Sequence, residues 1–278
     1  MNRKRNTQLF ALPAPPPEQL ELPGGRYLLS RVFKHDFFAA TCLYESADAA
    51  ELAKVVVKFG RTQSFCGLPM VWLARLLRGR EEAIYRALRG IPGVPRWAGS
   101  IGRTAYAIEY VEGRPLDHPP PPPEGFFDAL RDLFDEVHRR GVAYGDANKR
   151  SNILIDLQGR PSLIDYQLAI RRRDHWPWPV RPLVALAVDN LARKDLYHLY
   201  KHKRRISPQE LTREEDALSR RRGGLHRLHR ALGKPYRALR RRFLSAQERR
   251  GRLQSPTADL EDHHQPEKDT WRKGRHGT

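Results

Sequence analysis

The sequence predicts an α+β protein with two lobes: an antiparallel sheet with one main helix, followed by a mostly helical part. Three observations predict this class. Short segments rich in aromatic and β-branched residues fill the first half of the chain, whereas apolar residues at helical spacing dominate after residue 125. An unbroken proline run, 119–123, marks the expected boundary between the lobes. A chain of 278 residues can bury a sizeable core.

The predicted organisation has four parts. Residues 1–24 are rich in proline and polar residues, and we expect them to be disordered. Residues 25–117 would form the sheet lobe and the connection that follows it. Residues 118–250 would form the helical lobe, and the polar residues 251–278 a disordered tail.

Each predicted element follows from a local pattern. Period-two and aromatic-rich segments predict the strands 26–33, 35–44 and 52–59, then a hairpin of 94–101 and 104–111. Apolar residues at helical spacing predict helices at 68–88 and 126–140, and a buried helix or helix pair at 183–200 with Asp195 as a buried anchor. Two further strands, 153–155 and 162–164, would turn at 156–159.

Positive charge is the strongest global signal. The chain carries 51 Lys and Arg against 32 Asp and Glu, a formal net charge of +19, which predicts an acidic partner. Residues 201–250 alone hold 17 Lys and Arg against 5 Asp and Glu. Apolar residues at helical spacing in 225–243 predict two basic amphipathic helices, which would bind an anionic membrane surface or RNA. The alternative is an apolar stripe packed on the lobe with solvated arginines.

Composition also excludes several classes. Cys42 and Cys66 are the only cysteines, so we expect no disulfides and a reducing compartment. The apolar residues 9–12 are too few for a signal peptide, and no run approaches the ~18 apolar residues of a transmembrane helix. We therefore expect a cytoplasmic protein, with a peripheral position on the inner face of the cytoplasmic membrane as a further possibility.

The stretch from Gly141 to Ile170 holds the candidate chemistry. A hairpin would bring Asn152, at the start of its first strand, to face Asp165, at the end of its second. Their oxygens suit Mg²⁺ that carries a nucleotide phosphate, and Asp146 could accept a proton from an attacking hydroxyl. The alternative is a hairpin with incidental turn acids.

These residues resemble the catalytic loop and metal-binding turn of the protein-kinase-like superfamily, H-R-D-x-x-x-x-N and D-F-G. The match has departures: Tyr144-Gly145 replaces His-Arg, Asn152 comes one residue late, and Asp165-Tyr166-Gln167 replaces D-F-G. The short form D-x-N-K-R-x-N looks more like the bacterial lipopolysaccharide-kinase and RIO-like branch than like signalling kinases.

The resemblance extends into the first lobe. Val55-Val-Val-Lys58 is similar to the V-A-I-K strand, which implies that Lys58 binds the ATP phosphates. Glu81 would orient Lys58, with Glu82 as the second choice. The alternatives are a lysine that extends to solvent and a solvated charged helix face.

The segment 108–115 looks like the kinase hinge, so Glu109 and Val111 would contact adenine through their backbone. The sequence lacks a glycine-rich phosphate loop, and Lys34 and His35 would substitute for it by charge.

The resemblance also implies roles at the catalytic loop. Asn152 and Asp165 would bind Mg²⁺, with Asn148 as the open alternative to Asn152. Asp146 would orient or deprotonate the acceptor hydroxyl, and Lys149 or Arg150 would neutralise the phosphoryl group unless these are solvated loop charges. Asn148 stands where signalling kinases have a lysine, which argues mildly against a protein substrate.

The sequence as a whole favours an ATP- and Mg²⁺-dependent phosphotransferase that resembles lipopolysaccharide kinases. Its expected acceptor is a sugar hydroxyl of an acidic, lipid-linked glycan at the cytoplasmic membrane face. The alternatives are a RIO-like atypical serine/threonine kinase that contacts RNA or ribosomes, and a pseudokinase scaffold, which the missing glycine loop and Tyr144-Gly145 favour.

Overall fold

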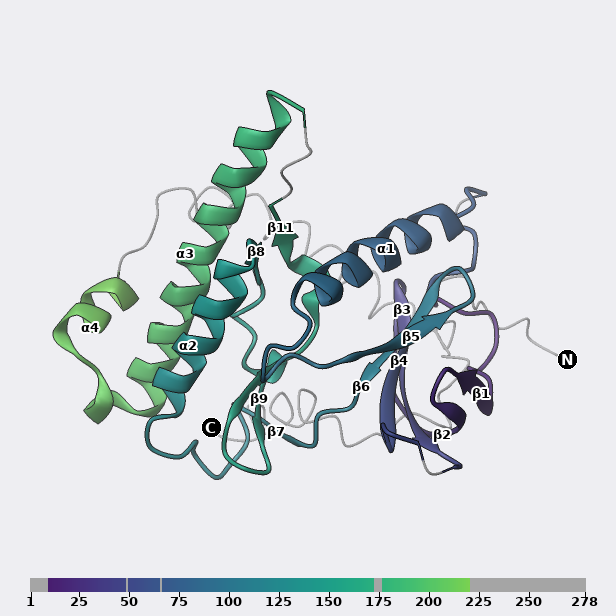
Figure 1. Cartoon of the computed structure of the whole chain (residues 1–278), viewed down its shortest axis with the longest axis horizontal. Helices are drawn as coiled ribbons and strands as arrows, with labels where there is room; N and C mark the ends of the chain where they lie inside the picture. Colours follow the sequence, from purple (N-terminus) through teal and green to yellow (C-terminus); the bar gives the residue numbers. More distant parts are fainter. Residues whose placement is uncertain (1–9, 49, 66, 173–176, 221–278) are drawn as a thin grey trace, which may run out of the picture. The chain divides into compact units, whose positions relative to one another are not determined.

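The computed structural model describes residues 10–48, 50–65, 67–172 and 177–220 (Figure 1). The described chain divides into two compact units. Unit 1 holds the residues up to Arg78 together with Ala98–Tyr110. Unit 2 holds Gly79–Trp97 and the residues from Val111 onward.

Unit 1 is built on a six-stranded sheet with the strand order β1-β2-β3-β4-β6-β5. The strands are β1 (Gln19–Leu22), β2 (Gly25–His35), β3 (Ala39–Ser46), β4 (Lys54–Gly60), β5 (Trp97–Ile101) and β6 (Ala105–Glu109). The pairs from β1 to β4, and β4 with β6, are antiparallel. The predicted strands therefore all form, and they form the predicted kind of sheet.

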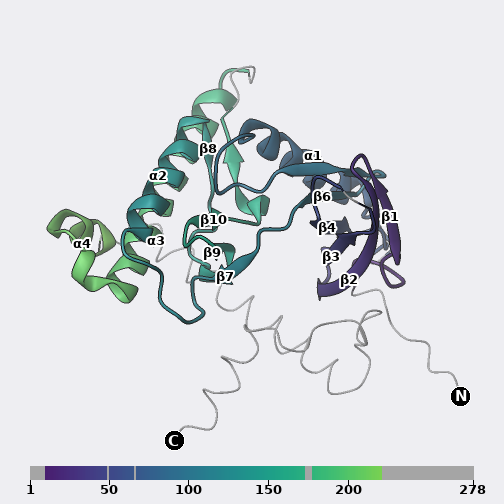
Figure 2. The same cartoon turned by 60° about the horizontal axis from the view of Figure 1, so that its bottom comes forward.

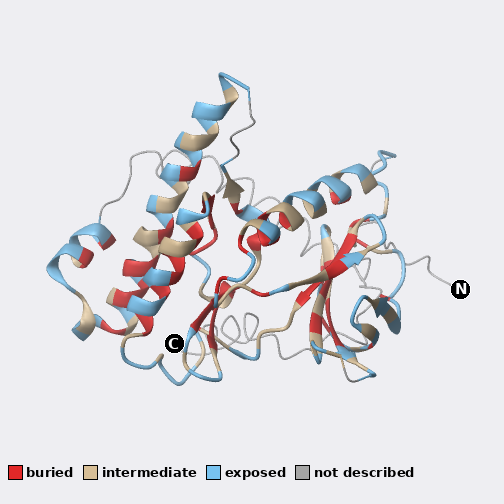
Figure 3. Ribbon diagram, viewed as in Figure 1, coloured by how far each residue is buried: buried red, intermediate tan, exposed pale blue. Residues whose placement is uncertain are grey.

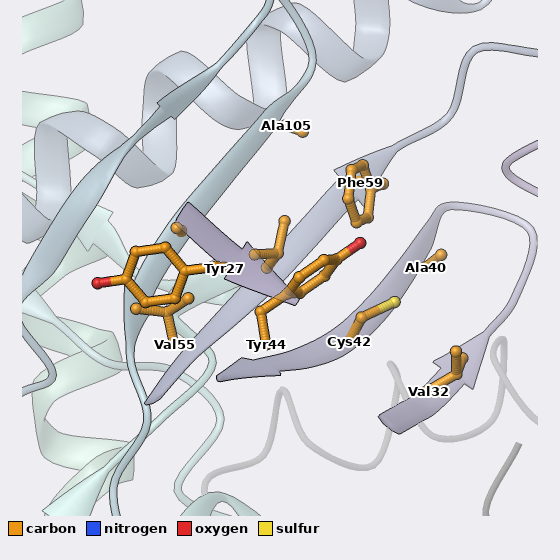
Figure 4. Packing of buried hydrophobic residues seen from close by; sticks show 10 residues of the cluster. Tyr27, Val32, Ala40, Cys42, Tyr44, Val55, Phe59 and Ala105 are labelled. Carbon is orange, nitrogen blue, oxygen red and sulfur yellow. The ribbon is translucent and has the colours of Figure 1, made fainter. Parts of the chain in front are cut away.

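The core of unit 1 lies on one face of this sheet (Figure 4). In β4 the buried side chains alternate with half-buried ones, so Val55, Val57 and Phe59 enter the core. Buried side chains from β2 and β3, among them Tyr27 and Tyr44, pack against them. Because neighbouring strand residues point to opposite faces, Lys58 lies on the other face of the sheet.

The ordered structure begins earlier than predicted. Residues 1–24 were expected to be disordered, but β1 pairs with β2 and Ala11 is fully buried. A buried cation explains the difference: the Arg61 guanidinium donates to the carbonyl oxygens of Phe10 at 3.1 Å and Phe37 at 2.9 Å. The prediction is wrong for residues 10–24, because a proline-rich segment can be fixed by contacts from elsewhere in the chain.

Unit 2 is mostly helical. Its helices are the second half of α1 (Val71–Ala87), then α2 (Phe126–Arg139), α3 (Val180–Ile206) and α4 (Arg213–Arg220). Its short strands are β7 (Gly113–Pro115), β8 (Val142–Ala143), β9 (Ile153–Asp156), β10 (Pro161–Leu163) and β11 (Ile170–Arg171). They form a three-stranded sheet of order β10-β9-β7 and the pair β11-β8. Helices α2 and α3 lie side by side (Figures 1 and 2).

Helix α2 forms as predicted, because its apolar residues fall on one stripe that is entirely buried. The stripe consists of Phe126, Phe127, Leu130, Leu133, Phe134 and Val137. Gly141, at φ 72°, then takes a left-handed conformation that favours glycine. The helix therefore delivers the chain to β8 and the candidate catalytic loop.

The boundary between the units falls after Tyr110, ahead of the proline run. Strand β7 already pairs with β9, with Gly113 opposite Asp156. Arg114 then donates to the carbonyl oxygens of His118 at 2.8 Å and Pro121 at 3.1 Å. The run 119–123 is thus part of unit 2, and the prediction that it separates the lobes is wrong.

Helix α3 is one continuous helix, and its two halves differ (Figure 3). The second half is buried at Asp195, Leu199 and His202. The first half was predicted to be buried as well, but Leu183 is 64% exposed and Leu186 57%. The prediction of a helix is confirmed. The prediction that its first half is buried is wrong, because the apolar pattern does not show that another segment covers it.

None of the helices in the described part of the chain is long and apolar enough to cross a bilayer. The predicted basic helices at 225–243 and the tail 251–278 lie outside the described residues, as does Cys66. Cys42 is a buried, unoxidised thiol in the core of unit 1.

Candidate active site

The candidate catalytic loop is in unit 2, between β8 and β9. Asp146 is only 7% exposed, and two side chains contact its Oδ2 atom. The Asn152 amide donates to it at 2.8 Å, and the Lys149 ammonium lies 2.7 Å away. Three residues predicted from the sequence thus form one cluster around a carboxylate.

The β9–β10 hairpin has the predicted form. Leu163 pairs with Ile153, and the Ile164 amide donates to the Asn152 carbonyl at 3.0 Å. Asp165 follows directly, so the hairpin brings it to the same end as Asn152. Asp165 has φ 63° and is the one non-glycine residue with positive φ in the described chain. Such a conformation costs on the order of 1 kcal/mol or more and is often found at functional sites.

Three buried tyrosines connect the parts of this site. The Tyr166 ring lies 5.1 Å from that of Tyr144 and 5.2 Å from that of Tyr85, which belongs to α1. The Tyr144 hydroxyl donates to the Ile164 carbonyl. Burial raises the pKa of Tyr144 well above its ordinary value, and the nearby groups Tyr166, Asp165 and Asp146 raise it further. Tyr144 and Tyr166, which replace the motif's histidine and phenylalanine, therefore pack against each other.

The glycine in place of the motif's arginine has a steric cause. Gly145 has φ 81°, and a Cβ atom there would lie 2.8 Å from Leu191 Cδ2 and 3.0 Å from the Leu168 carbonyl oxygen. A side chain at this position would displace the backbone or α3. Glycine is therefore needed at position 145, because α3 packs too close to leave room for a side chain.

Asp195 is the buried anchor that the sequence predicted. Its carboxylate accepts the amides of Tyr144 and Gly145, each at 2.9 Å, and His138 Nε2 lies 3.1 Å away. Asp195 is 1% exposed, and burial raises its pKa despite these hydrogen bonds. The loop backbone on the N-terminal side of Asp146 is thus fixed by α3.

His202 was missed by the sequence reasoning. Its Nε2 atom donates to the Ala147 carbonyl at 2.9 Å, on the C-terminal side of Asp146. Burial lowers the pKa of His202 to about 4, so the ring is neutral near pH 7. Asp195 and His202 are seven residues apart and lie on one helix face. That spacing was the available signal, but the run of basic residues at 201–205 obscured it.

Lys203 lies within the basic stretch 201–205, yet it is buried. It is 2% exposed, and its ammonium pairs with Asp128 at 2.9 Å and Glu215 at 3.1 Å. Two of the five residues, His202 and Lys203, are therefore buried and structural.

Of the two candidate glutamates, Glu81 is the buried one, at 3% exposure. Glu82 instead pairs with Arg86 at 2.6 Å, as an ordinary charge pair one turn apart. After burial, the Glu81 charge is the largest cause that raises the pKa of Tyr85, which contacts Tyr166. Lys58 lies on β4 in unit 1. Its pairing with Glu81 stays a prediction.

The hinge-like segment follows β6. Glu109 pairs with Val55 in the sheet, and the Tyr110 amide donates to the Lys54 carbonyl at 3.2 Å. Val111 comes next and is half-buried. The contact of Glu109 and Val111 with adenine stays a prediction.

The prediction that His35 helps to replace a glycine-rich loop by its charge is wrong. Its ring is buried, accepts the Leu12 amide at Nε2 over 3.1 Å, and contacts the Phe10 ring. Lys34 pairs with Asp36 at 2.7 Å, and it remains exposed. The phosphate contact of Lys34 therefore stays a prediction, whereas the buried His35 is not available for it.

The site residues fit a magnesium ion that arrives with a nucleotide. Asn152 uses its amide nitrogen on Asp146, which leaves its oxygen as a hard ligand beside the Asp165 end of the hairpin. No group of three or more His, Cys, Asp or Glu in the described chain could hold a metal by itself. Mg²⁺ bound to a nucleotide needs only one or two protein ligands, because phosphates and water complete its shell. Asn148, the alternative ligand, is exposed on the loop.

No protein-family model matches the sequence, and no curated protein matches it. Two matching solved structures are of the Rio2 kinase from Chaetomium thermophilum. One, a complex with ADP/Mg²⁺ and phosphoaspartate, has 18% identity and a TM-score of 0.45, covering 66% of this chain and 58% of that one. The other has 20% identity and a TM-score of 0.44, covering 64% and 56%. The chain thus matches less than two thirds of the length of either structure.

The elements follow one another in a fixed order. Strand β4 of the sheet, which carries Lys58, is followed by helix α1 with the buried Glu81 and then by the segment after β6. Helix α2, the loop that holds Asp146 and the β9–β10 hairpin that leads to Asp165 come next. The described chain therefore has the predicted α+β organisation, an antiparallel-sheet part that carries one helix and a helical C-terminal part.

Proposed function

We propose that this chain is an ATP- and Mg²⁺-dependent phosphotransferase that uses a hydroxyl acceptor. The observation that carries the proposal is the buried Asp146 carboxylate, held by Asn152 and Lys149 beside the hairpin end that bears Asp165. A structural hairpin with incidental turn acids does not require a buried carboxylate with this pair of partners.

Each residue has a proposed role. Asp146 orients the acceptor hydroxyl and takes its proton as the hydroxyl oxygen attacks the γ-phosphorus and the bond to the β–γ bridging oxygen breaks. Asn152 and Asp165 hold Mg²⁺, which when bound neutralises charge on the phosphates. Lys149 places a positive charge beside the transferring group.

Outside the loop the proposed roles concern the nucleotide. Lys58 binds its α- and β-phosphates and Glu81 orients that lysine, while the backbone of Glu109 and Val111 contacts the adenine. Arg150, half-buried at the start of the turn before β9, is the second candidate for a charge at the phosphoryl group.

For the acceptor we favour a protein hydroxyl, as in an atypical, RIO-like serine/threonine kinase. The argument against a protein substrate was that Asn148 replaces a lysine. Lys149, one residue later, places its ammonium 2.7 Å from the Asp146 carboxylate and supplies that missing charge. This contact supports the proposal of a protein acceptor.

A second acceptor, the sugar hydroxyl of a lipid-linked glycan, is favoured by one observation. The first turns of α3 expose large apolar side chains, which suits an enzyme that works at a lipid surface. The same fold and the same loop chemistry would serve this acceptor.

The test is phosphate transfer from γ-labelled ATP by the purified chain, offered itself, a general protein acceptor and a lipid-linked glycan extract. We expect label in protein, and loss of that label in Asp146→Asn but not in Asp189→Asn, which alters an exposed carboxylate. Label confined to glycan would replace the first acceptor with the second. Nucleotide binding without any transfer would identify a pseudokinase and overturn the proposal.

A further inference from the structure

The first turns of α3 and the residue pair before them form an apolar tip, defined here as residues 178–187. Trp178 is 85% exposed, Leu183 64% and Leu186 57%. The first buried residue of the helix is Val188. In Figure 1 this end of α3 extends past the neighbouring helix α2, and in Figure 3 it is largely exposed.

The apolar tip differs from an ordinary soluble surface. Single exposed leucines are common, but several large apolar side chains close together usually mark an interaction site. Leu183 and Leu186 are one turn apart and share a helix face. Arg181 is the single charged residue between 178 and 188. The segment is too short to cross a bilayer, for which ~18 apolar residues are needed.

Two cationic residues follow the apolar tip along the same helix. Arg193 follows Leu186 by seven residues and Lys194 follows Leu183 by eleven, so both continue the exposed face that carries the leucines. Seven residues of helix rise by about 10 Å. Asp189 is the one acidic residue between 178 and 194, and it pairs with Arg172 at 2.6 Å. An apolar end is therefore followed by positive charge at about the depth of a lipid headgroup layer.

We propose that the apolar tip docks on an anionic lipid bilayer. Trp178, Leu183 and Leu186 enter the interface, and Arg193 and Lys194 meet the lipid phosphates. A bilayer is the occupant that fits this geometry, because the tip is the end of a helix that inserts rather than a groove that receives. Tryptophan favours this interfacial depth, and long cationic side chains extend to headgroups from it.

The proposal goes beyond the proposed function and does not depend on catalysis. A chain without phosphotransferase activity would still bind vesicles through this tip, and an active enzyme without it would still phosphorylate soluble acceptors. Vesicle binding and phosphate transfer are therefore separate readouts.

The test is sedimentation of the full chain with vesicles of phosphatidylcholine containing 30% phosphatidylglycerol, against phosphatidylcholine alone. We expect the double variant Leu183→Glu/Leu186→Glu to lose at least tenfold in vesicle affinity. The matched control is Leu157→Glu/Leu218→Glu, which makes the same charge change at leucines that are 72% and 41% exposed elsewhere in unit 2. This control should bind within about twofold of wild type.

A second readout reports insertion directly. Brominated lipid should quench part of the tryptophan emission of the wild type, and Trp178→Phe should remove that part while leaving vesicle affinity within about threefold. Equal binding by both double variants would overturn the proposal, because other basic segments would then account for adhesion. So would a concentration-dependent dimer that only Leu183→Glu/Leu186→Glu disrupts, since the tip would then join two copies. Melting curves of all variants establish that each is folded.

Discussion

At the scale of single residues, the site is organised around the Asp146 carboxylate. Its two contacts differ in kind: Asn152 donates a neutral hydrogen bond, and Lys149 adds charge. A carboxylate is the form of this side chain that can accept a proton from a hydroxyl. The backbone on either side of Asp146 is held by two side chains of α3: Asp195 accepts the Gly145 amide, and His202 donates to the Ala147 carbonyl.

Replacement of Asp146 by Asn tests its proposed role. The amide keeps the size and one oxygen of the carboxylate but cannot take a proton, so we expect kcat to fall by roughly 10²- to 10⁴-fold. The affinity for the Mg²⁺-nucleotide should stay within about threefold, because Asp146 is not a proposed metal ligand. Steady-state turnover and nucleotide titration measure the two quantities. A fall in affinity with unchanged kcat would assign Asp146 to nucleotide binding instead.

His202 should act through the loop that it holds. His202→Leu removes the hydrogen bond to the Ala147 carbonyl, so we expect kcat to fall about tenfold with KM nearly unchanged, and faster hydrogen exchange in residues 144–148. His202→Gln can donate again and should recover part of kcat.

The neighbouring Lys203→Met is the matched control for His202. It leaves Glu215 buried without its cation, which costs about 3 kcal/mol of unfolding free energy, but it does not contact the loop. It should retain kcat. If Lys203→Met and His202→Leu lowered kcat equally for equal loss of stability, His202 would be merely structural.

At the scale of elements, the sequence predicts the sheet, α1, α2 and the β9–β10 hairpin, because their patterns are local. It also places Asn152 and Asp165 at one end of the hairpin, since a hairpin fixes where its ends lie. What it missed depends on contacts between distant segments. His202 meets Ala147 across 55 residues and Arg61 meets Phe10 across 51, and no local pattern encodes either contact.

Exposure was also hard to predict. The first turns of α3 were predicted to be buried but are exposed, because hydrophobicity indicates a preference for burial and not the presence of a partner. Lys203 is buried because Asp128 and Glu215 accept it. Those two acids lie on other helices, 75 and 12 residues away.

Arg61 should hold the N-terminal segment on the sheet of unit 1. Its guanidinium donates to four backbone carbonyls, those of Phe10, Phe37, Gln63 and Ser64. Arg61→Met would leave these oxygens without that donor, and we expect a loss of about 3 kcal/mol in unfolding free energy. Chemical denaturation measures it, with Arg26→Met, an exposed arginine, expected to change stability by less than about 0.5 kcal/mol. Equal effects would show that Arg61 is not a structural centre.

At the scale of the whole molecule, His202 links stability to pH. Its pKa is lowered to about 4 by burial, and the positive charges of Arg150, Lys201 and Arg205 lower it further against the hydrogen bond to Ala147. Between pH 6.5 and 4 the unfolded chain binds a proton that the folded chain does not, so stability falls as pH falls through this window. The contribution is fully present above pH 6.5 and amounts to about 3 kcal/mol.

The matching measurement is the difference in unfolding free energy between wild type and His202→Gln, followed from pH 7.5 to 4. We expect the difference to change with pH mainly below 6.5, with wild type losing more stability on acidification. Other buried groups titrate in both proteins, so they cancel in the difference. Parallel pH curves would contradict the buried, neutral state of His202.

The central claim is that unit 2 carries a nucleotide-phosphate site that depends on Mg²⁺ and on Asp165. Calorimetric titration of a non-hydrolysable ATP analogue, with and without Mg²⁺, tests it most directly in wild type and Asp165→Ala. We predict that Mg²⁺ strengthens binding at least tenfold in wild type and less than twofold in Asp165→Ala. Equal strengthening in both proteins, or no nucleotide binding by wild type, would contradict the account.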